Sequence, residues 1–498
     1  MRVQKVTGTL VIVMLIALTT ACDIVHTRNK RSIDIDKDIC CTFDAQSIDV
    51  PYTTTIFESD QSTSPAALVA TTDAEWISEI STPTRGTLRI VVDENVGDMR
   101  TATINLSGEE TLSTSISISQ IAAPKERVEH TLLFYFFGTS LNRFFDNNIR
   151  DASKAVGEGI LGEEGRILFA RQTSQSEGYI GELCYDPIHH SAIERYIEPF
   201  TLDYTEVSNT AIASIMAQMT TEAPAERYGM IIAGHGQGWV TREAINGDDS
   251  GELLHYRPTN WTPVPGADIT RALGERNIQK DITDLAEIVT LSDIELEYIL
   301  FDMCFMASIE ALYDLRDVAD YIIASPCEIM GNGFPYHRTL PHLFVDYGKS
   351  SDLVAAAESY YTFYRDEYQG NKCGSVVVVD CSELEPLAEA TRTLMSTAST
   401  EYDIDTLQYY EGQQVHTFYD FGQYCRVVAT DQAALAAFDT QMECAVVGKF
   451  TLPTFYSAYG YGNHNIDLEA YSGLTTSAPS KAYPEEWRTT SWYKRVME

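Results

Sequence analysis

Six short apolar runs constrain the fold of this 498-residue chain more than any other feature. Each run is too short to cross a membrane, and each is nearly continuous, as expected of strands covered on both faces of a parallel sheet. Helix-like segments separate them; after the fourth run, apolar residues recur at i, i+4, i+7 and i+8 from Phe305. This alternation predicts a doubly wound, mostly parallel α/β domain over 125–498, with an Asp/Glu-rich insert at 241–290. The runs are TLLFYFFG (131–138), RILFARQ (166–172), YGMIIAGHG (228–236), YILFDMC (298–304), DYIIASP (320–326) and GSVVVVDC (374–381).

The first 123 residues have a different composition. Residues 1–22 join a basic start, a short apolar core and small residues before Cys22, which is typical of an export signal. The polar segment 23–43 is interpreted as a tether. From 44 to 123, apolar and polar residues alternate in short runs, which predicts half-buried antiparallel strands and a small all-β sandwich.

Two of the apolar runs end in residues that can perform nucleophilic chemistry. His235 follows one run and Cys304 ends another, and the carboxyl ends of parallel strands gather functional residues at one edge of a sheet. An imidazole beside a thiol favours the reactive thiolate, and we expect the helix predicted after Cys304 to favour it further through its dipole. The backbone N–H groups of Gly236 and Cys304 could stabilise the oxyanion of an acyl-transfer intermediate, with His235 protonating the leaving amine.

The paired pattern resembles the clostripain family of cysteine peptidases, which are relatives of the caspases. The resemblance covers about 130–498 and rests on IIAGHGQGW, ILFDMCFMASIEALYDLRDVADYIIAS, GNGFPY and GSVVVVDCSELEPLAEA. It implies a caspase-like fold, a catalytic dyad of His235 and Cys304, and a thioester acyl-enzyme. It also implies that Asp302 receives an Arg or Lys side chain in the specificity pocket; the alternative for Asp302 is a cap on the following helix.

One turn departs from the family pattern. Where the family carries acidic residues, the turn ASPCEIMGNGF has Pro326, Cys327 and Asn332, so a second acidic arm of the pocket is in doubt. Glu328 is the candidate to replace it from a shifted position.

The family resemblance also implies a zymogen that is cut in the insert after a basic residue. The sequence leaves the choice open. The basic residues between His235 and the Cys304 strand are Arg242, Arg257, Arg271, Arg276 and Lys280.

No motif in the chain requires a cofactor. The carboxylates of NGDDSGE (246–252) are candidate calcium ligands, because calcium matters to some relatives, but they lack EF-hand spacing. The formal charge of −37 disfavours nucleic acid as a partner.

The N-terminal segments resemble exported bacterial proteins. LTTAC resembles a lipobox, which implies cleavage before Cys22, lipidation of its thiol and a membrane anchor in the cell envelope. AEWISEI, VDENVGDMRTATI and ISISQ resemble a BACON domain, a β-sandwich proposed to bind glycan in some members; a spacer is the other interpretation.

We therefore predict a lipid-anchored cysteine endopeptidase that cleaves proteins or peptides after Arg or Lys. The alternative is a glycan- or protein-binding lipoprotein with an inactive peptidase-like scaffold. A third interpretation is transpeptidation by the same dyad, because an amine can attack a thioester in place of water.

Overall fold

The computed structural model describes residues 32–55, 67–108, 112–202, 207–246, 263–272, 280–344, 351–460 and 465–498. The chain forms two compact units, one of residues 1–123 with 186–189 and one of 124–185 with 190–498. Cys22 and the proposed signal lie outside the described residues, as does all of the segment 246–252 except Asn246.

The first unit contains two four-stranded sheets. Alternating side chains of the strands bury a core that includes Leu88, Ile90, Ile104 and Ile118. The first two strands correct the tether predicted at 23–43: each belongs to one of the sheets, so the sandwich begins no later than residue 32. One sheet has the order β1 (Ser32–Ile35), β3 (Gln46–Thr55), β6 (Thr87–Val92), β5 (Ile77–Thr84), and the other β2 (Asp38–Cys41), β8 (Ser113–Gln120), β7 (Arg100–Gly108), β4 (Leu68–Thr71).

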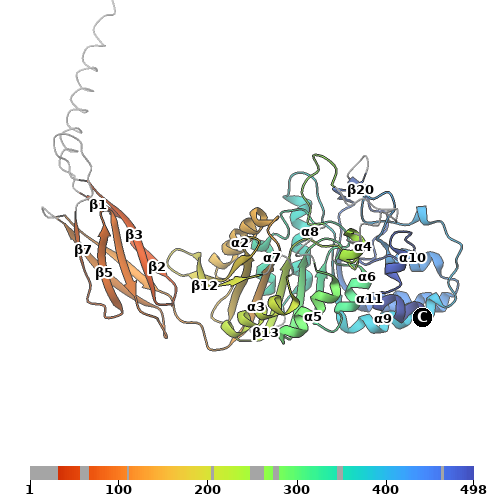
Figure 1. Cartoon of the computed structure of the whole chain (residues 1–498), viewed down its shortest axis with the longest axis horizontal. Helices are drawn as coiled ribbons and strands as arrows, with labels where there is room; N and C mark the ends of the chain where they lie inside the picture. Colours follow the sequence, from red (N-terminus) through yellow and green to blue (C-terminus); the bar gives the residue numbers. More distant parts are fainter. Residues whose placement is uncertain are drawn as a thin grey trace, which may run out of the picture. The chain divides into compact units, whose positions relative to one another are not determined.

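The second unit is built on a nine-stranded sheet (Figure 1). Its five central strands are parallel, and they bury the apolar runs of the sequence between two helical layers. The run at 374–381 forms an antiparallel strand, in contrast to the parallel neighbours expected for it. The strand order is β12 (Ser191–Thr201), β11 (Glu177–Asp186), β10 (Gly165–Gln172), β9 (Val128–Phe136), β13 (Ala225–Ala233), β14 (Leu296–Asp302), β15 (Ala319–Ala324), β16 (Val376–Asp380), β18 (Val446–Phe450).

Helices cover both faces of this sheet (Figure 1). On one face lie α2 (Asn142–Gly157), α7 (Tyr336–Leu343) and α8 (Leu353–Asp366). On the other lie α3 (Asn209–Glu222), α5 (Ile282–Ser292), α6 (Ile309–Leu315), α9 (Leu384–Met395), α11 (Gln432–Ala445) and α13 (Ser491–Met497). The remaining helices and strands are α4 (Arg242–Asn246), α10 (Phe421–Val428), α12 (Pro484–Trp487), η3 (Cys381–Glu383), η4 (Ile404–Thr406), β17 (Tyr419–Asp420), β19 (Thr454–Tyr456), β20 (Asn465–Asp467) and β21 (Thr475–Thr476).

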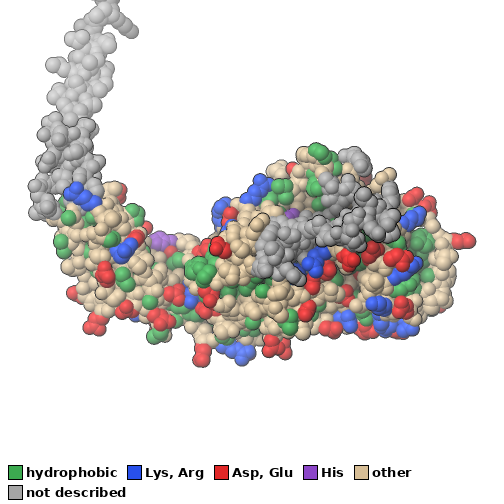
Figure 2. Space-filling model, in the orientation of Figure 1, with side chains coloured by type: hydrophobic (Ala, Val, Ile, Leu, Met, Phe, Trp, Pro, Cys, Tyr) green, Lys and Arg blue, Asp and Glu red, His purple; other side chains and the backbone are tan. Residues whose placement is uncertain are grey.

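Acidic side chains are dispersed over the visible face of the molecule and alternate there with Lys and Arg (Figure 2). Among the side chains coloured there, the acidic residues are spread out and form no single patch. Within the described ranges, no helix combines the length and apolar character needed to cross a membrane.

Candidate active site

The sheet places the predicted dyad at one edge. Strands β13 and β14 are parallel neighbours, with Ala233 opposite Asp302. His235 and Cys304 each follow these paired residues by two positions, so both lie beyond the carboxyl ends of adjacent strands. This is the arrangement that the apolar runs predicted.

Gly236 packs directly against the backbone of Cys304. A Cβ added to Gly236 would lie 2.2 Å from the Cys304 carbonyl oxygen and 2.7 Å from the Cys304 nitrogen. The absence of a side chain therefore allows the two predicted oxyanion-hole residues to approach each other at the sheet edge.

A segment of the insert occupies this edge in an extended conformation. Arg271 donates its N–H to the Ile329 carbonyl at 2.8 Å, and the Gly331 N–H donates to the Ile269 carbonyl at 2.7 Å. Thr270 forms an antiparallel bridge with Met330. The Gly236 N–H donates to the Arg271 carbonyl oxygen at 2.8 Å. The segment is thus bound as an added β-strand, the way many proteins bind peptides, with the Arg271 carbonyl on one of the predicted oxyanion donors.

The side chain of Arg271 is completely buried in a polar pocket. Its Nη1 lies 2.8 Å from Asp302 Oδ2 and donates to the Asp302 carbonyl at 3.1 Å, while Nη2 donates to Asn148 Oδ1 at 2.7 Å. Nε donates to the Gly331 carbonyl at 3.2 Å. A buried charge needs partners of this kind, because desolvation without them costs several kcal/mol.

Asp302 lies at the base of this pocket. Tyr336 Oη donates to Asp302 Oδ2 at 2.6 Å, and the Phe334 N–H donates to it at 3.2 Å. Burial raises the pKa of Asp302, while the Arg271 guanidinium and the Tyr336 hydroxyl oppose the rise. Gly333 has a φ of +70°, and a Cβ there would lie 2.3 Å from both Arg271 Nη2 and Asp302 Oδ2, so the pocket needs glycine at this position.

His235 contacts Ala272, the residue that follows Arg271. Its Nδ1 is 3.1 Å from the Ala272 carbonyl oxygen, and its Nε2 is 2.9 Å from Ser140 Oγ. Tyr459 Oη also donates to the Ala272 carbonyl, at 3.1 Å. The imidazole is therefore positioned next to Ala272, whose nitrogen would be the leaving group if this bond were cut.

The thiol of Cys304 is fully buried in this form of the protein. Burial raises its pKa well above the usual range, and the carboxylate of Glu328 raises it further. The Ile329 N–H, which donates to Cys304 Sγ at 3.0 Å, opposes this effect. These effects together favour the protonated thiol in this form of the protein.

The helix expected immediately after Cys304 begins later. Helix α6 starts at Ile309 with Ser308 as its N-cap, and Phe305 has a φ of +63°. The prediction that the helix dipole acts on the Cys304 sulfur is therefore wrong. The same observation removes the alternative role of Asp302, because Ser308 is the residue that caps this helix.

The structure places two residues of the turn that differs from the family pattern, Asn332 and Glu328. Asn332 has an exposed side chain, and only its carbonyl contributes near the pocket, by accepting from Asn148 Nδ2 at 2.9 Å. Glu328 is buried, but it binds Thr270 and not the guanidinium of Arg271. The expectation that Glu328 replaces the missing acidic residue of the arginine pocket is therefore wrong.

Sequence reasoning missed Asn148, Tyr336, Ser140 and Tyr459. The available signal was at Asn148, which is a polar residue on the buried, otherwise apolar face of α2. A buried amide at such a position needs a hydrogen-bonding partner, and here the partner is Arg271.

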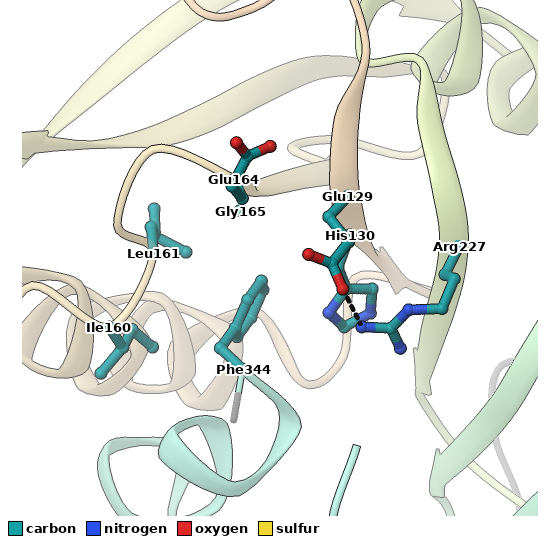
Figure 3. A pocket seen from close by; sticks show the side chains of 8 residues that line it. All are labelled: Glu129, His130, Ile160, Leu161, Glu164, Gly165, Arg227 and Phe344. Atoms are coloured by element: carbon teal, nitrogen blue, oxygen red, sulfur yellow. Dashed lines mark ion pairs between the residues drawn. The ribbon is translucent and has the colours of Figure 1, made fainter. Parts of the chain in front are cut away.

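Elsewhere, the described residues contain no cluster of three or more His, Cys, Asp or Glu side chains suited to a metal ion. A separate cavity opens at the amino ends of β9 and β13, away from the dyad (Figure 3). Glu129 and Arg227 form an ion pair of 3.6 Å in it, and burial lowers the pKa of His130 to about 3. His130 is therefore neutral at physiological pH.

Comparison with known proteins places the chain among peptidases. The family model described as the clostripain family matches residues 189–465, more than half of the chain. No curated protein matches the sequence.

Solved structures of several proteases resemble the chain, among them three C11 proteases. A secreted C11 cysteine protease from Bacteroides thetaiotaomicron is 29% identical, covers 74% of this chain and 99% of its own, and gives a TM-score of 0.64. An inactive zymogen C11 protease from Parabacteroides distasonis is 27% identical, with coverages of 75% and 99% and a TM-score of 0.60. A secreted C11 protease from Bacteroides thetaiotaomicron in complex with an irreversible peptide inhibitor is 23% identical, with coverages of 74% and 98% and a TM-score of 0.59, and this likeness bears on the fold alone.

The family match covers both His235 and Cys304, and the fold is the mixed α/β fold of these proteases. On this evidence the chain belongs to the clostripain family and is a cysteine peptidase.

Proposed function

We propose that the protein is an endopeptidase that cleaves after Arg, and that the described form is its precursor. The observation that carries this proposal is the position of Arg271. Its side chain pairs with Asp302, its carbonyl accepts from Gly236, and His235 contacts the next residue, Ala272. The chain holds its own Arg271–Ala272 bond as a substrate would be held.

The reaction follows from this arrangement. His235 takes the proton of the Cys304 thiol, and the sulfur attacks the carbonyl carbon of the arginine and forms a C–S bond. The Gly236 N–H, together with that of Cys304, stabilises the oxyanion, and His235 transfers a proton to the leaving nitrogen as the C–N bond breaks. Water then hydrolyses the thioester, which releases the carboxylate and restores the thiol.

The pocket is expected to favour Arg over Lys. Arg271 uses Nε, Nη1 and Nη2 to reach Asp302, Asn148 and the Gly331 carbonyl. A lysine ammonium is a compact group and cannot span these separated acceptors. Two neutral acceptors, Asn148 Oδ1 and the Gly331 carbonyl, therefore take the place of a second acidic side chain and match the planar guanidinium.

Among the basic residues proposed for activation, Arg271 is the one we select. Arg242 is 41% exposed and pairs with acidic side chains on α5, while Lys280 donates to the Val207 carbonyl and to Asn209 Oδ1. Arg257 and Arg276 lie outside the described residues. After a cut between Arg271 and Ala272, the new carboxyl end could leave the pocket. The pocket would then be open to other substrates. The Parabacteroides distasonis relative is itself described as an inactive zymogen.

We extend the proposal to export and anchoring. One relative is described as secreted, and the LTTAC segment before Cys22 would direct lipidation of this chain. The β-sandwich would then act as a spacer, with glycan contact as a second role that binding of the whole chain to immobilised glycans would test. Membrane fractionation of the full chain and of its Cys22→Ala variant tests the anchor, because the variant is expected in the soluble fraction.

The activity is tested on the chain from residue 23 onward. Fluorogenic peptides ending in Arg, Lys, Ala or Asp are incubated with the protein before and after nicking by trypsin, beside the Cys304→Ala variant. We expect hydrolysis of the Arg peptide by the nicked protein, weaker hydrolysis of the Lys peptide, and none by the variant. If the nicked protein hydrolysed none of the four peptides, the proposed cleavage after Arg would be refuted. Added amine nucleophiles test transpeptidation, because they would then appear in the product.

A further inference from the structure

The buried carboxylate of Glu328 does not line the arginine pocket, and besides raising the pKa of the Cys304 thiol it contacts the bound segment. Thr270 Oγ1 donates to Glu328 Oε2 at 2.6 Å. The other donors come from a single loop: Ser457 Oγ donates to Oε1, and the Ala458 N–H donates to Oε1 at 3.2 Å and to Oε2 at 3.1 Å. Glu328 is completely buried.

The backbone pairing shows which substrate position Thr270 occupies. Residues 269–271 lie antiparallel to 329–331, and the side chains of a strand point alternately to opposite sides. Arg271 enters the Asp302 pocket, so Thr270 takes the place of the residue before the cleaved arginine, the P2 residue. Thr270 is 5% exposed, whereas Ile269 at the preceding position is 46% exposed. The side chain at P2 is therefore enclosed by the protein, whereas the side chain at P3, the position before P2, faces solvent.

The chemistry of this subsite is selective. Burial raises the pKa of Glu328 to about 7, while Ser457, Thr270 and the Ala458 N–H oppose the rise. At pH 8 the carboxylate is ionised and can only accept hydrogen bonds. A P2 hydroxyl supplies a donor, an apolar P2 side chain leaves a buried charged acceptor short of one partner, and an acidic P2 side chain repels it.

We propose that Glu328 forms a P2 subsite that selects substrates with Thr or Ser before the cleaved arginine. The substrate class is then a peptide with the sequence Thr/Ser-Arg at the scissile bond. This inference rests on the proposed cleavage after Arg and narrows it. It assigns a specificity role to a residue that sequence reasoning placed at the arginine pocket.

The test compares Thr with Val at P2, since the two side chains have the same shape and differ in the hydroxyl. The trypsin-nicked enzyme is assayed at pH 8 on peptides that end in Ile-Thr-Arg or Ile-Val-Arg. We expect kcat/KM to be about 10-fold or more higher for Thr. Replacing the P3 Ile by Thr is the matched control and should change the rate less than about 2-fold, because that position is exposed.

The Glu328→Met variant provides a second test of the P2 subsite. The Thr/Val ratio is independent of the amount of folded enzyme, and it should fall to 1 or below in this variant. Glu328→Gln, which keeps one oxygen acceptor, should give an intermediate ratio. A wild-type ratio near 1, or a ratio unchanged in Glu328→Met, would overturn the inference while leaving cleavage after Arg intact.

A third test does not depend on peptidase activity. In the inactive Cys304→Ala chain, the burial of Arg271 should make trypsin cut after this residue slowly, so that the rate of nicking can be followed. Thr270→Val should raise the rate of nicking after Arg271 by about 5-fold or more, because the segment loses its contact with Glu328, and Ile269→Thr should leave the rate unchanged. Equal nicking of the two variants would contradict the subsite even if no peptide were cleaved.

Discussion

Asparagine in place of Asp302 removes the charge from the arginine pocket and keeps the shape of the side chain. Asp302 is fully buried and faces Arg271 Nη1 at 2.8 Å. In the Asp302→Asn enzyme, an arginine side chain would enter the same pocket without its counter-ion. The substitution therefore tests whether the Arg271 contact shows how substrates are recognised.

The size of the effect follows from the burial of the pair. Removing one partner of a buried charge pair costs about 3–5 kcal/mol, which corresponds to roughly 150- to 5,000-fold in kcat/KM. Burial raises the pKa of Asp302, and this penalty on the ionised form offsets part of the gain from the ion pair. We therefore expect a loss near the lower end, about 150-fold, for arginine substrates.

The assay uses two substrates, one ending in arginine and one in citrulline, its neutral isostere. The nicked wild-type enzyme should prefer arginine about 100-fold or more, and the Asp302→Asn enzyme should show a ratio near 1. Glu358→Gln, a change at an exposed position on α8, is the matched control and should keep the wild-type ratio. A strong arginine preference retained in Asp302→Asn would refute the assignment of the pocket.

Three further substitutions test the site. Gly236→Ala should lower kcat at least about 100-fold, because its Cβ would collide with the Cys304 backbone and displace an oxyanion donor; peptide hydrolysis measures this. Ser140→Ala removes the 2.9 Å contact with His235 Nε2 and should lower kcat about 3- to 10-fold with little change in KM, as steady-state kinetics would show. Glu328→Gln should remove a pH dependence of stability. Folding raises the pKa of the Glu328 carboxyl from 4.5 to about 7, so the folded state binds this proton more tightly than the unfolded state does. The free energy of unfolding of the glutamate chain is therefore expected to fall as pH rises from 4.5 through 7. In a Cys304→Ala background, the glutamate chain should lose about 3 kcal/mol more than the glutamine chain between pH 4.5 and 8, measured by urea unfolding.

Each of these expectations has its own control or contradiction. Gly97→Ala places a Cβ in open space and should leave both activity and thermal stability unchanged. A Ser140→Ala enzyme with altered KM alone would show that the hydroxyl binds substrate and does not position the imidazole. Parallel stability curves for the glutamate and glutamine chains would mean that Glu328 ionises normally in the folded state.

Much of the architecture was predictable because it depends on local patterns. The apolar runs identify the central strands, and two of them end in His235 and Cys304, so the placement of both residues at one sheet edge follows from the rule for carboxyl edges. The direction of β16 was not predictable, since a buried apolar run looks the same in a parallel or an antiparallel pair. The strand at 32–35 had a signal, because SIDI alternates polar and apolar residues, but charged neighbours suggested a tether.

The content of the arginine pocket could not be derived from the sequence. Five basic residues lie in or near an irregular insert, and nothing local distinguishes Arg271 from the others. Its selection depends on pairing with residues 329–331 and on Asn148 of α2, both distant in the chain. The error about the helix dipole had a similar cause, because the turn at Phe305, with its positive φ, delays the helix to Ile309.

The central claim is that the Arg271–Ala272 bond lies in the active site as a substrate. N-terminal sequencing and intact-mass analysis of the purified chain test it most directly, with Cys304→Ala, Arg271→Ala and Arg242→Ala prepared in parallel. The account predicts a new amino terminus at Ala272 in the wild type and in Arg242→Ala, and an uncut chain in the other two variants. Processing at another bond, or an uncut wild-type chain with full activity, would contradict it.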